Sequence, residues 1–293
     1  MHADQVELSD VAVKRLVAGQ FPHWADLPVT RVQSGGTSNA LYRLGPELAL
    51  RLPLLADAAE DALREAEHLP RIAPHLPLAI PAPIAVGAPA EGYPFAWSVT
   101  SWLAGTDAFT TPPADLRQAA HDMAAFIRAL RAIPVAVPVP PRGRGGSLAP
   151  RDARVQSCLG QLEGEIDTAA AAAAWAQSLA APAYDGPPRW LHGDLHPANL
   201  LVAAGRISGV IDWGTFATGD PATELLFAWM VLDRPARALF RELIDVDPAS
   251  WLRGRGWALS MAVIALPYYL DSNPTLVAIS RRAIAEVLAD FTG

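Results

Sequence analysis

The most constraining feature of this chain is a polar turn set between short apolar stretches near its middle. The sequence is WLHGDLHPANLLV from residue 190 and VIDWG from residue 210. Apolar runs on both sides of Ala204 and Gly205 predict two strands joined by a tight turn, a β-hairpin. Strands paired in this way bring Asn199 and Asp212 to the same end of the hairpin.

The polar residues of this stretch suit one kind of chemistry. Asp194 is a carboxylate in a turn, Asn199 follows five residues later, and Asp212 ends the returning strand. The spacing from Asp194 to Asn199 is that of a kinase catalytic loop, in which the Asp accepts the proton of the substrate hydroxyl and the Asn holds Mg²⁺. Mg²⁺ prefers one or two protein oxygens together with phosphate oxygens. The pattern therefore predicts a phosphoryl-transfer site with Asp194 as base and Asn199 and Asp212 as metal ligands.

Two other interpretations of the same residues remain open. His192 and His196 are four apart, the spacing of a zinc pair on a helix, but Pro197 argues against a continuous helix there. A metal-dependent hydrolase using the two histidines and Asp194 would leave the amide and the second carboxylate without a role. Asp and Asn also cap ordinary turns, an explanation that accounts for one residue at a time.

The motifs at residues 192–199 and 211–214, HGDLHPAN and IDWG, resemble those of the aminoglycoside and macrolide phosphotransferase family. The resemblance implies an α+β, protein-kinase-like, two-lobed fold with a small antiparallel-sheet N-lobe and a mostly helical C-lobe. It places the N-lobe, which covers the nucleotide, at residues 1–103. The C-lobe, with the catalytic loop and the acceptor pocket, takes residues 104–293. The implied cofactors are ATP, or GTP, and Mg²⁺.

The chain departs from protein kinases in two places. Gly193 stands where a protein kinase has an Arg before the catalytic Asp, so no Arg there awaits a phosphorylated activation loop. The segment after Asp212 is short and contains the tripeptide Gly-Asp-Pro at residues 219–221 instead of an Ala-Pro-Glu signature. We therefore expect no protein substrate.

A predicted hairpin near the N-terminus supplies the expected phosphate loop. Residues 29–44 form two alternating runs around a polar, Gly-containing turn. An ordinary hairpin turn explains this pattern as well as a phosphate cradle does. The resemblance assigns nucleotide contacts to four small residues of the turn: Gly35, Gly36, Thr37 and Ser38.

The next strand, residues 49–53, lies where a kinase has a phosphate-binding Lys paired with a helix Glu. Lys14 is the one lysine of the whole chain, and the strand contains Arg51 instead. A guanidinium is permanently charged and binds phosphate well, so Arg51 is expected to replace the lysine, although a solvent-facing Arg is the alternative. On the helix at residues 58–72, the resemblance implies Glu65 as its partner, with Glu67 as the less favoured choice and a plain surface carboxylate as the alternative.

The strand at residues 95–105 ends in a Gly turn and resembles the hinge of the family. Backbone groups there are expected to meet the adenine edge, because a flat heteroaromatic ring needs in-plane hydrogen bonds between apolar faces. The assigned residues are Thr100, Ser101, Trp102 and Leu103. Trp102 is equally consistent with a core position.

Composition and the remaining segments limit the other possibilities. A formal charge of −7 over 293 residues argues against nucleic-acid binding, and the single Cys158 excludes an internal disulfide. No apolar, positively headed segment opens the sequence, which favours a cytoplasmic protein without a membrane partner. Residues 258–270 are apolar but too short to span a bilayer, so we expect a core helix. Residues 155–179 also predict a helix, and residues 134–150 an irregular, mobile loop.

The acceptor is the least constrained part of the prediction. Residues 104–293 carry 19 acidic and 16 basic side chains, too mild a balance to identify a polycationic substrate. Aromatic and acidic residues near the end suggest a pocket for a partly apolar amine such as a macrolide, although such aromatics are more often core. These residues are Trp251, Trp257, Tyr268, Tyr269 and Asp271.

We therefore expect an ATP- and Mg²⁺-dependent O-phosphotransferase acting on a small hydroxyl compound, an antibiotic of the aminoglycoside or macrolide type, and hence antibiotic resistance. The alternatives are a small-metabolite kinase like the choline, homoserine or fructosamine kinases, and a nucleotide-binding protein without catalysis, which the missing strand lysine supports.

Overall fold

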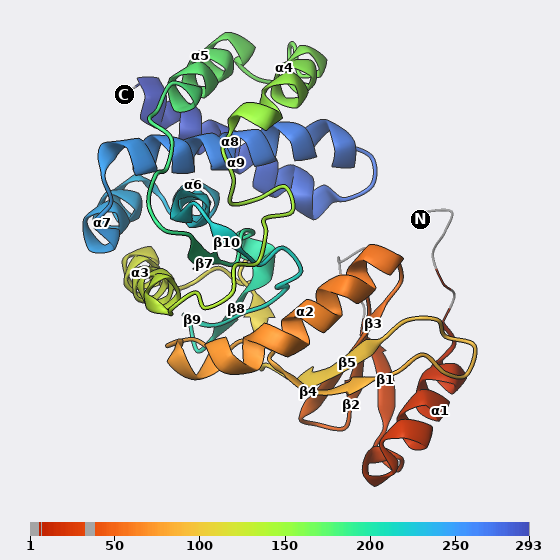
Figure 1. Ribbon diagram of the computed structural model, residues 1–293. Coiled ribbons are helices and arrows are strands. Elements are labelled where there is room, and N and C mark those ends of the chain that lie inside the picture. Colours follow the sequence, from red (N-terminus) through yellow and green to blue (C-terminus); the bar gives the residue numbers. More distant parts are fainter. Residues whose placement is uncertain (1–5, 7, 33–38, 293) are drawn as a thin grey trace. The chain divides into compact units, whose positions relative to one another are not determined.

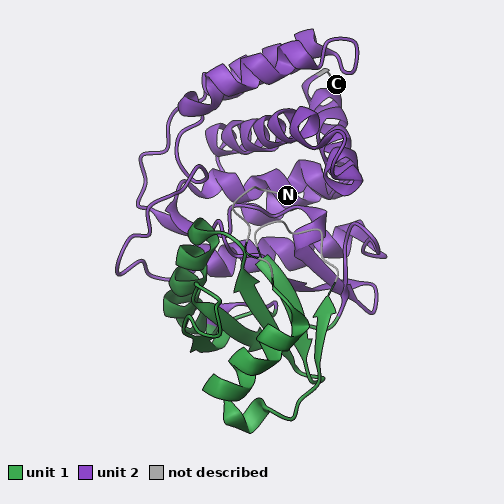
Figure 2. Cartoon of the chain, turned by 90° about the vertical axis from the view of Figure 1, so that its right-hand side faces the viewer, with its two compact units in different colours: residues 1–74, 79–104 green, residues 75–78, 105–293 purple. Residues whose placement is uncertain are grey.

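The structure is a computed structural model, which describes residue 6, residues 8–32 and residues 39–292 (Figure 1). The four small residues expected at the phosphate loop, Gly35, Gly36, Thr37 and Ser38, lie outside this described part. The chain divides into two compact units (Figure 2). Unit 1 is Met1–Pro74 with Ala79–Ala104, and unit 2 is His75–Leu78 with Gly105–Gly293. The sequence places the boundary between residues 103 and 104.

Unit 1 is built on a five-stranded antiparallel sheet in the order β1-β2-β3-β5-β4. Its strands are β1 (Val29–Val32), β2 (Asn39–Leu44), β3 (Leu48–Pro53), β4 (Pro83–Gly87) and β5 (Trp97–Ser101). Its helices are α1 (Asp10–Gln20), the 3₁₀ turn η1 (Pro22–Trp24) and α2 (Ala56–Ile72), and a further turn η2 (Ala73–His75) leads toward unit 2.

The two helices of unit 1 cover opposite faces of its sheet. Successive residues of a strand point to opposite faces, so the buried Leu50 and Leu52 of β3 face one side and Arg51 faces the other. The leucines share a core with Val13 and Leu16 of α1. Arg51 meets the side of α2, which is therefore the helix on the opposite face.

Unit 2 contains two small sheets and most of the helices. One sheet pairs β7 (Arg189–Leu191) with β10 (Ala217–Gly219), and the other joins β6 (Thr106–Asp107), β8 (Leu200–Ala203) and β9 (Arg206–Val210). The α-helices are α3 (Leu116–Ala132), α4 (Asp152–Gln161), α5 (Thr168–Leu179), α6 (Phe227–Met230), α7 (Arg234–Ile244), α8 (Pro248–Tyr269) and α9 (Pro274–Thr292). Three 3₁₀ segments complete it: η3 (Ala149–Arg151), η4 (Pro197–Asn199) and η5 (Pro221–Leu226).

Helix α8 is the core of unit 2. It packs against α4, α5, η5 and α9, and its residues from Trp251 to Val263 are buried with the exception of one half-exposed leucine. A helix packed on several sides has no polar face, which explains why residues 258–263 are almost entirely apolar. The predicted core helix is confirmed for this part, whereas Tyr268 and Leu270 at the end of the predicted segment are exposed. Within the described residues, no helix is both long enough and apolar enough to cross a membrane.

The single helix predicted at residues 155–179 is wrong, because the segment forms two helices. Between α4 and α5, Gly164 has φ of +83°, a backbone conformation that ends helices and suits glycine. Asp167 then caps α5, its side chain accepting a hydrogen bond of 2.9 Å from the N–H of Ala170.

The close approach of Gly87 to the ring of Trp97 gives a stability prediction. Trp97 is fully buried, and a Cβ added at residue 87 would lie 2.1 Å from its ring. Gly87→Ala is therefore expected to lower the free energy of unfolding by about 1–3 kcal/mol in urea titrations. Gly19→Ala is the control, because nothing lies within 4 Å of the added methyl in α1, and it should stabilise by about 0.4–1 kcal/mol. Equal stability of the two variants would contradict this packing.

Candidate active site

A glycine turn positions Asp194 at the end of β7. Gly193 has φ of +84°, which side chains rarely adopt, and an added Cβ would lie 3.2 Å from the carbonyl oxygen of Thr215. Strand β7 itself is fixed by pairing with β10, which sets Leu191 opposite Ala217. The chain then makes the single 3₁₀ turn η4 and enters β8. No continuous helix carries His192 and His196, so the helical zinc pair is not formed.

His192 is a structural residue of this turn. Its Nδ1 accepts a hydrogen bond of 3.1 Å from the N–H of Asp194, and its Nε2 lies 3.0 Å from the carbonyl oxygen of Ile211 and donates to it. Burial lowers the pKa of the imidazole, which keeps it neutral. Both ring nitrogens are used, so His192 has no lone pair for a metal. No group of three His, Cys, Asp or Glu in the described part could hold a metal, and the hydrolase alternative loses its geometric basis.

A buried carboxyl, Glu224 of η5, is hydrogen-bonded to the backbone of the same turn. Its Oε1 accepts a hydrogen bond of 2.7 Å from the N–H of Gly193, and its Oε2 has no hydrogen-bond partner among the described residues. Burial raises the pKa of Glu224 to about 7, against the opposing effects of the Gly193 and His192 N–H groups and of Arg131. This residue was not predicted from the sequence. Its signal was a lone acid within the apolar run from residue 221 to residue 232.

Asp194 is held by an arginine that the sequence analysis did not identify. Nη1 of Arg144 donates to Oδ1 of Asp194 at 2.5 Å and to the carbonyl oxygen of Gly193 at 2.9 Å. Nε2 of His196 lies 3.6 Å from Oδ2. Burial would raise the pKa of Asp194, but Arg144 and His196 outweigh it and hold the pKa well below its usual range. The carboxylate is therefore ionised at neutral pH.

The loop that carries Arg144, residues 134–150, was predicted to be irregular and mobile. It has no regular structure beyond its last residues, but it is tied to β10 and the residue that follows it. The N–H of Thr218 donates to Val139 O at 2.8 Å, and the N–H of Asp220 donates to Gly145 O at 2.8 Å. Gly219 allows this approach, because a Cβ there would lie 2.2 Å from Gly145 O. The mobile loop expected from composition is thus a fixed support for Arg144.

The hairpin that follows places the two expected metal ligands as predicted. Leu200 pairs with Val210, and the N–H of Ile211 donates to Asn199 O at 2.9 Å, so Asn199 and Asp212 lie at the same end. Nδ2 of Asn199 donates to the backbone oxygen of Asp194 at 3.0 Å. This bond occupies the amide nitrogen, so a metal would be bound through the amide oxygen.

Asp212 is exposed and has φ of +61°. One amide oxygen and one carboxylate are a donor set that fits Mg²⁺, which completes its coordination with phosphate and water.

In unit 1, Arg51 and Glu65 form an ion pair. Nη1 of Arg51 donates to Oε2 of Glu65, whose side chain is buried on α2. The side chain of Arg51 is 13% exposed, so the solvent-facing alternative is wrong. Glu67 is 66% exposed and contacts His68, which excludes it as the partner.

The expected hinge segment is partly committed to other contacts. Thr100 is buried in β5, and the N–H of Trp102 donates to Glu47 O at 2.7 Å. The guanidinium of Arg43 lies 4.8 Å from the Trp102 ring centroid, and the ring is half-buried rather than core. The N–H of Trp102 is therefore not available to a base edge, and other backbone groups of residues 100–103 would have to serve.

A pocket of about 360 Å³ in unit 2 includes Asp194 in its wall. Of the C-terminal residues expected to line an acceptor pocket, Tyr268 and Tyr269 do so, whereas Trp251 and Trp257 are buried in the core and Asp271 is not part of the wall. The other lining residues are Arg144, Arg151, Arg154, His196, Met230, Met261, Ala262, Ile264, Ala265, Leu276, Ile279 and Ser280.

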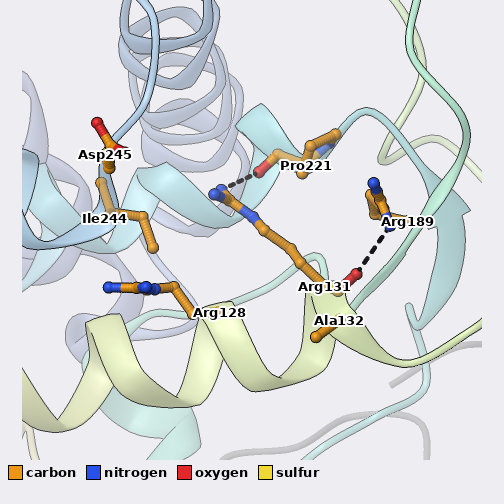
Figure 3. A pocket seen from close by; sticks show the side chains of 7 residues that line it. All are labelled: Arg128, Arg131, Ala132, Arg189, Pro221, Ile244 and Asp245. Atoms are coloured by element: carbon orange, nitrogen blue, oxygen red, sulfur yellow. Dashed lines mark hydrogen bonds between the residues drawn. The ribbon is translucent and has the colours of Figure 1, made fainter.

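A second hollow of about 370 Å³ contains none of the residues that the sequence analysis singled out (Figure 3). Arg131 lies in it with Nη2 donating to Pro221 O at 2.9 Å, and Nη1 of Arg189 donates to Arg131 O at 3.3 Å. Arg128 also lines it and donates to Leu243 O. These arginines bind backbone carbonyls and hold α3 to its neighbours.

Comparison with known proteins gives the fold. The pattern of the phosphotransferase enzyme family, APH, matches residues 29–257. Wild-type aminoglycoside 2'-phosphotransferase-IIIa in its GDP complex shares 18% identity over 97% of this chain and 99% of its own, with a TM-score of 0.72. Macrolide 2'-phosphotransferase MphH from Brachybacterium faecium shares 22% identity over 94% and 97%, with a TM-score of 0.62. The α+β, protein-kinase-like fold is confirmed.

A third structure extends the likeness to a ternary complex. It is a thermostable mutant of aminoglycoside phosphotransferase APH(4)-Ia with AMP-PNP and hygromycin B, with 19% identity over 96% of this chain and all of its own, and a TM-score of 0.62. No match was found among curated proteins.

The raised pKa of Glu224 gives a pH prediction. In the unfolded chain this carboxyl titrates near 4.5, and in the folded chain near 7. Between these values the folded state keeps a proton that the unfolded state has lost, so this group lowers the free energy of unfolding as pH rises, by up to about 3 kcal/mol. Glu224→Gln should gain stability relative to wild type between about pH 5 and about pH 8 in urea titrations.

The wild-type curve alone does not isolate Glu224, because the lowered pKa of the neighbouring His192 makes stability rise with pH. The difference between wild type and Glu224→Gln removes this contribution. Glu242→Gln, at an exposed carboxyl on α7, is the control and should run parallel to wild type. A Glu224→Gln curve that also runs parallel to wild type would show that the buried carboxyl stays ionised.

Proposed function

Because the chain belongs to the phosphotransferase enzyme family, we propose that it transfers the γ-phosphate of ATP or GTP to a hydroxyl group of a small molecule. Asp194 is the base, and Asn199 and Asp212 hold Mg²⁺. One observation carries this proposal. An ionised carboxylate is fixed in the wall of a 360 Å³ pocket, and its turn leads directly into a hairpin that sets two oxygen ligands at one end.

The transfer follows from these positions. The acceptor oxygen forms a bond to the γ-phosphorus, the bond from that phosphorus to the bridging oxygen of the nucleotide breaks, and the hydroxyl proton moves to Asp194. Mg²⁺, when bound at Asn199 and Asp212, would supply positive charge to the phosphate oxygens. Arg144 fixes the orientation of Asp194 but lowers its basicity. The main contribution of Asp194 is therefore to hold the hydroxyl in line with the phosphorus and to accept the proton late in the transfer.

Unit 1 is proposed to hold the nucleotide. Arg51 carries a permanent charge, and its pairing with Glu65 orients the guanidinium as a lysine–glutamate pair would orient an ammonium. The nucleotide contacts assigned to residues 35–38 and to the hinge at residues 100–103 stay predictions. Because the ion pair is formed without a lysine, the missing strand lysine gives little support to a protein without catalysis.

The names of the similar structures suggest a class of acceptor. The similar structures are aminoglycoside and macrolide phosphotransferases by name, which supports an antibiotic acceptor. At 18–22% identity this likeness concerns the fold, and small-metabolite kinases similar to choline, homoserine or fructosamine kinases remain the alternative. Screening aminoglycosides, macrolides, amino alcohols and hydroxy acids for acceptor-dependent ATP or GTP consumption tests the activity itself.

The role of Asp194 predicts the behaviour of Asp194→Asn. The amide has nearly the same shape but cannot take up the proton, so kcat should fall by about 10²- to 10⁴-fold while nucleotide binding is kept. Steady-state turnover and nucleotide titration calorimetry measure the two quantities. Asp185→Asn, at an exposed carboxylate, is the control and should keep wild-type turnover. Near-normal turnover in Asp194→Asn would remove the assigned role.

The role of Arg51 predicts a defect confined to the nucleotide. Arg51→Ala should raise the KM for ATP and lower kcat, with little change in the KM of the acceptor. Arg51→Lys should recover part of the loss, because an ammonium keeps the charge but cannot bridge phosphate and carboxylate bidentately. Glu65→Gln should show a milder defect.

Arg71→Ala, at an exposed position near the end of α2, is the matched control for these titrations. Wild-type nucleotide kinetics in Arg51→Ala would mean that phosphate charge is neutralised by the metal and loop amides alone.

A further inference from the structure

The wall of the pocket at Asp194 is positively charged. Three arginines line it, Arg144, Arg151 and Arg154, and Asp194 is the one carboxylate among the lining residues that the structure describes. Arg144 is paired with that carboxylate at 2.5 Å. The described part of the pocket wall has no second carboxylate to neutralise the charges of Arg151 and Arg154. A polycationic acceptor would bring further positive charge next to them, which costs free energy in a partly desolvated pocket.

Arg151 is held in place without a carboxylate. Its Nε donates to Ser260 Oγ at 3.0 Å, its Nη1 donates to Gly143 O at 3.1 Å, and its guanidinium lies 5.0 Å from the centroid of the Trp257 ring. Burial, followed by the nearby charge of Arg144, lowers its pKa to about 10. A guanidinium has five N–H donors, so about three remain for a ligand. Keeping a half-buried charge without a counter-ion is unfavourable unless an anion offsets it.

Arg154 adds a second cation to the same pocket wall. It lies in α4, three residues after Arg151, which directly precedes α4 and has helical backbone angles, so both side chains lie on one side of the chain. It is exposed and makes no hydrogen bond or ion pair within the described part of the chain. Two arginines three residues apart suit the oxygens of a carboxylate or a phosphate, which bind guanidinium groups through paired hydrogen bonds.

Apart from His196 and Ser280, the rest of the wall is mostly apolar. Met230, Met261, Leu276 and Ile279 line it together with the two tyrosines that end α8. A volume of about 360 Å³ is at the small end for ligand pockets, about 300–1,000 Å³. The occupant is thus a compact molecule with an apolar body.

We propose that the acceptor is an amphiphilic hydroxyl compound bearing an oxyanion, a carboxylate or a phosphate, which Arg151 and Arg154 bind while its hydroxyl lies at Asp194. The inference rests on the proposed function, since it takes this pocket to be the acceptor site. It favours hydroxy acids and phosphorylated alcohols over aminoglycosides, macrolides and choline, all of which are cationic.

Binding of three probes with one body and different charges tests the charge preference. The probes are 4-phenylbutyrate, 4-phenylbutyramide and 4-phenylbutylamine, titrated into the full chain by calorimetry. The carboxylate should bind at least about tenfold more tightly than the amide, and the amine should bind most weakly. Phenethyl phosphate against phenethyl alcohol repeats the comparison and shows whether phosphate or carboxylate is the better oxyanion.

Substitutions connect the preference to the arginines. Arg151→Gln and Arg154→Gln should each reduce the preference for the anion, and the double variant should abolish it. Arg154 is exposed, so its variant reports even where Arg151→Gln fails to fold. Arg128→Gln, in the separate hollow of Figure 3, is the matched control and should keep the preference.

Three outcomes would overturn the inference: equal or tighter binding of the amine, failure of every probe to bind, or an anion preference that survives in the double variant. Its failure is distinguishable from that of the proposed function. Acceptor-dependent nucleotide consumption on neutral or cationic compounds, without an anion preference, overturns the inference alone. Anion binding through Arg151 and Arg154, without transfer to any hydroxyl compound, overturns the proposed function alone.

Discussion

The active site depends on the buried hydrogen bonds that fix the peptide groups from residue 192 to residue 194. Gly193 donates to Glu224, Asp194 donates to His192, and His192 donates to the residue that follows β9. Buried N–H groups left unpaired cost about 1–3 kcal/mol each, so loss of any of these partners would destabilise the turn. Because the partners come from separate segments, these bonds also connect β7, β9 and η5 around one carboxylate.

The same site shows how a charge is supplied from elsewhere in the chain. Protein kinases have an arginine directly before the catalytic Asp, and this chain has Gly193 there. A guanidinium nevertheless reaches Asp194, because the loop at residues 134–150 is held against β10 and presents Arg144. Having glycine at residue 193 and the arginine at residue 144 separates two tasks. The glycine can adopt the positive φ that the turn requires, and the arginine lies on a segment that also forms part of the pocket wall.

Unit 1 makes a comparable replacement at β3. A lysine would offer a point charge, whereas Arg51 offers a planar, permanently charged group that donates to Glu65. The ion pair is buried on the face of the sheet covered by α2. A partly buried pair is costly to break because one partner would be left charged in the interior. This cost explains why the guanidinium keeps one orientation.

Local sequence patterns were enough to predict part of the fold and part of the candidate site. The pairing of Arg51 with Glu65 was expected from the resemblance to the family. The sequence by itself determined the central hairpin, the ends of β8 and β9 and the core helix α8. These follow from alternation, helical spacing and turn residues, all of which act between near neighbours. It did not reveal the break at Gly164, because a glycine in a polar stretch is compatible with both a helix and its end.

Only the tertiary structure decided the roles of Arg144, Glu224, Arg151 and Arg154. Each acts on a group that is distant in sequence, as Arg144 does on a carboxylate fifty residues away. Spacing carries no information about such contacts, because the geometry of an irregular loop is set by where its backbone finds hydrogen-bond partners. Burial decided the rest. The charge of a pocket, and the pKa of an acid beneath a turn, depend on which side chains are removed from water together, and that is fixed only when the helices pack.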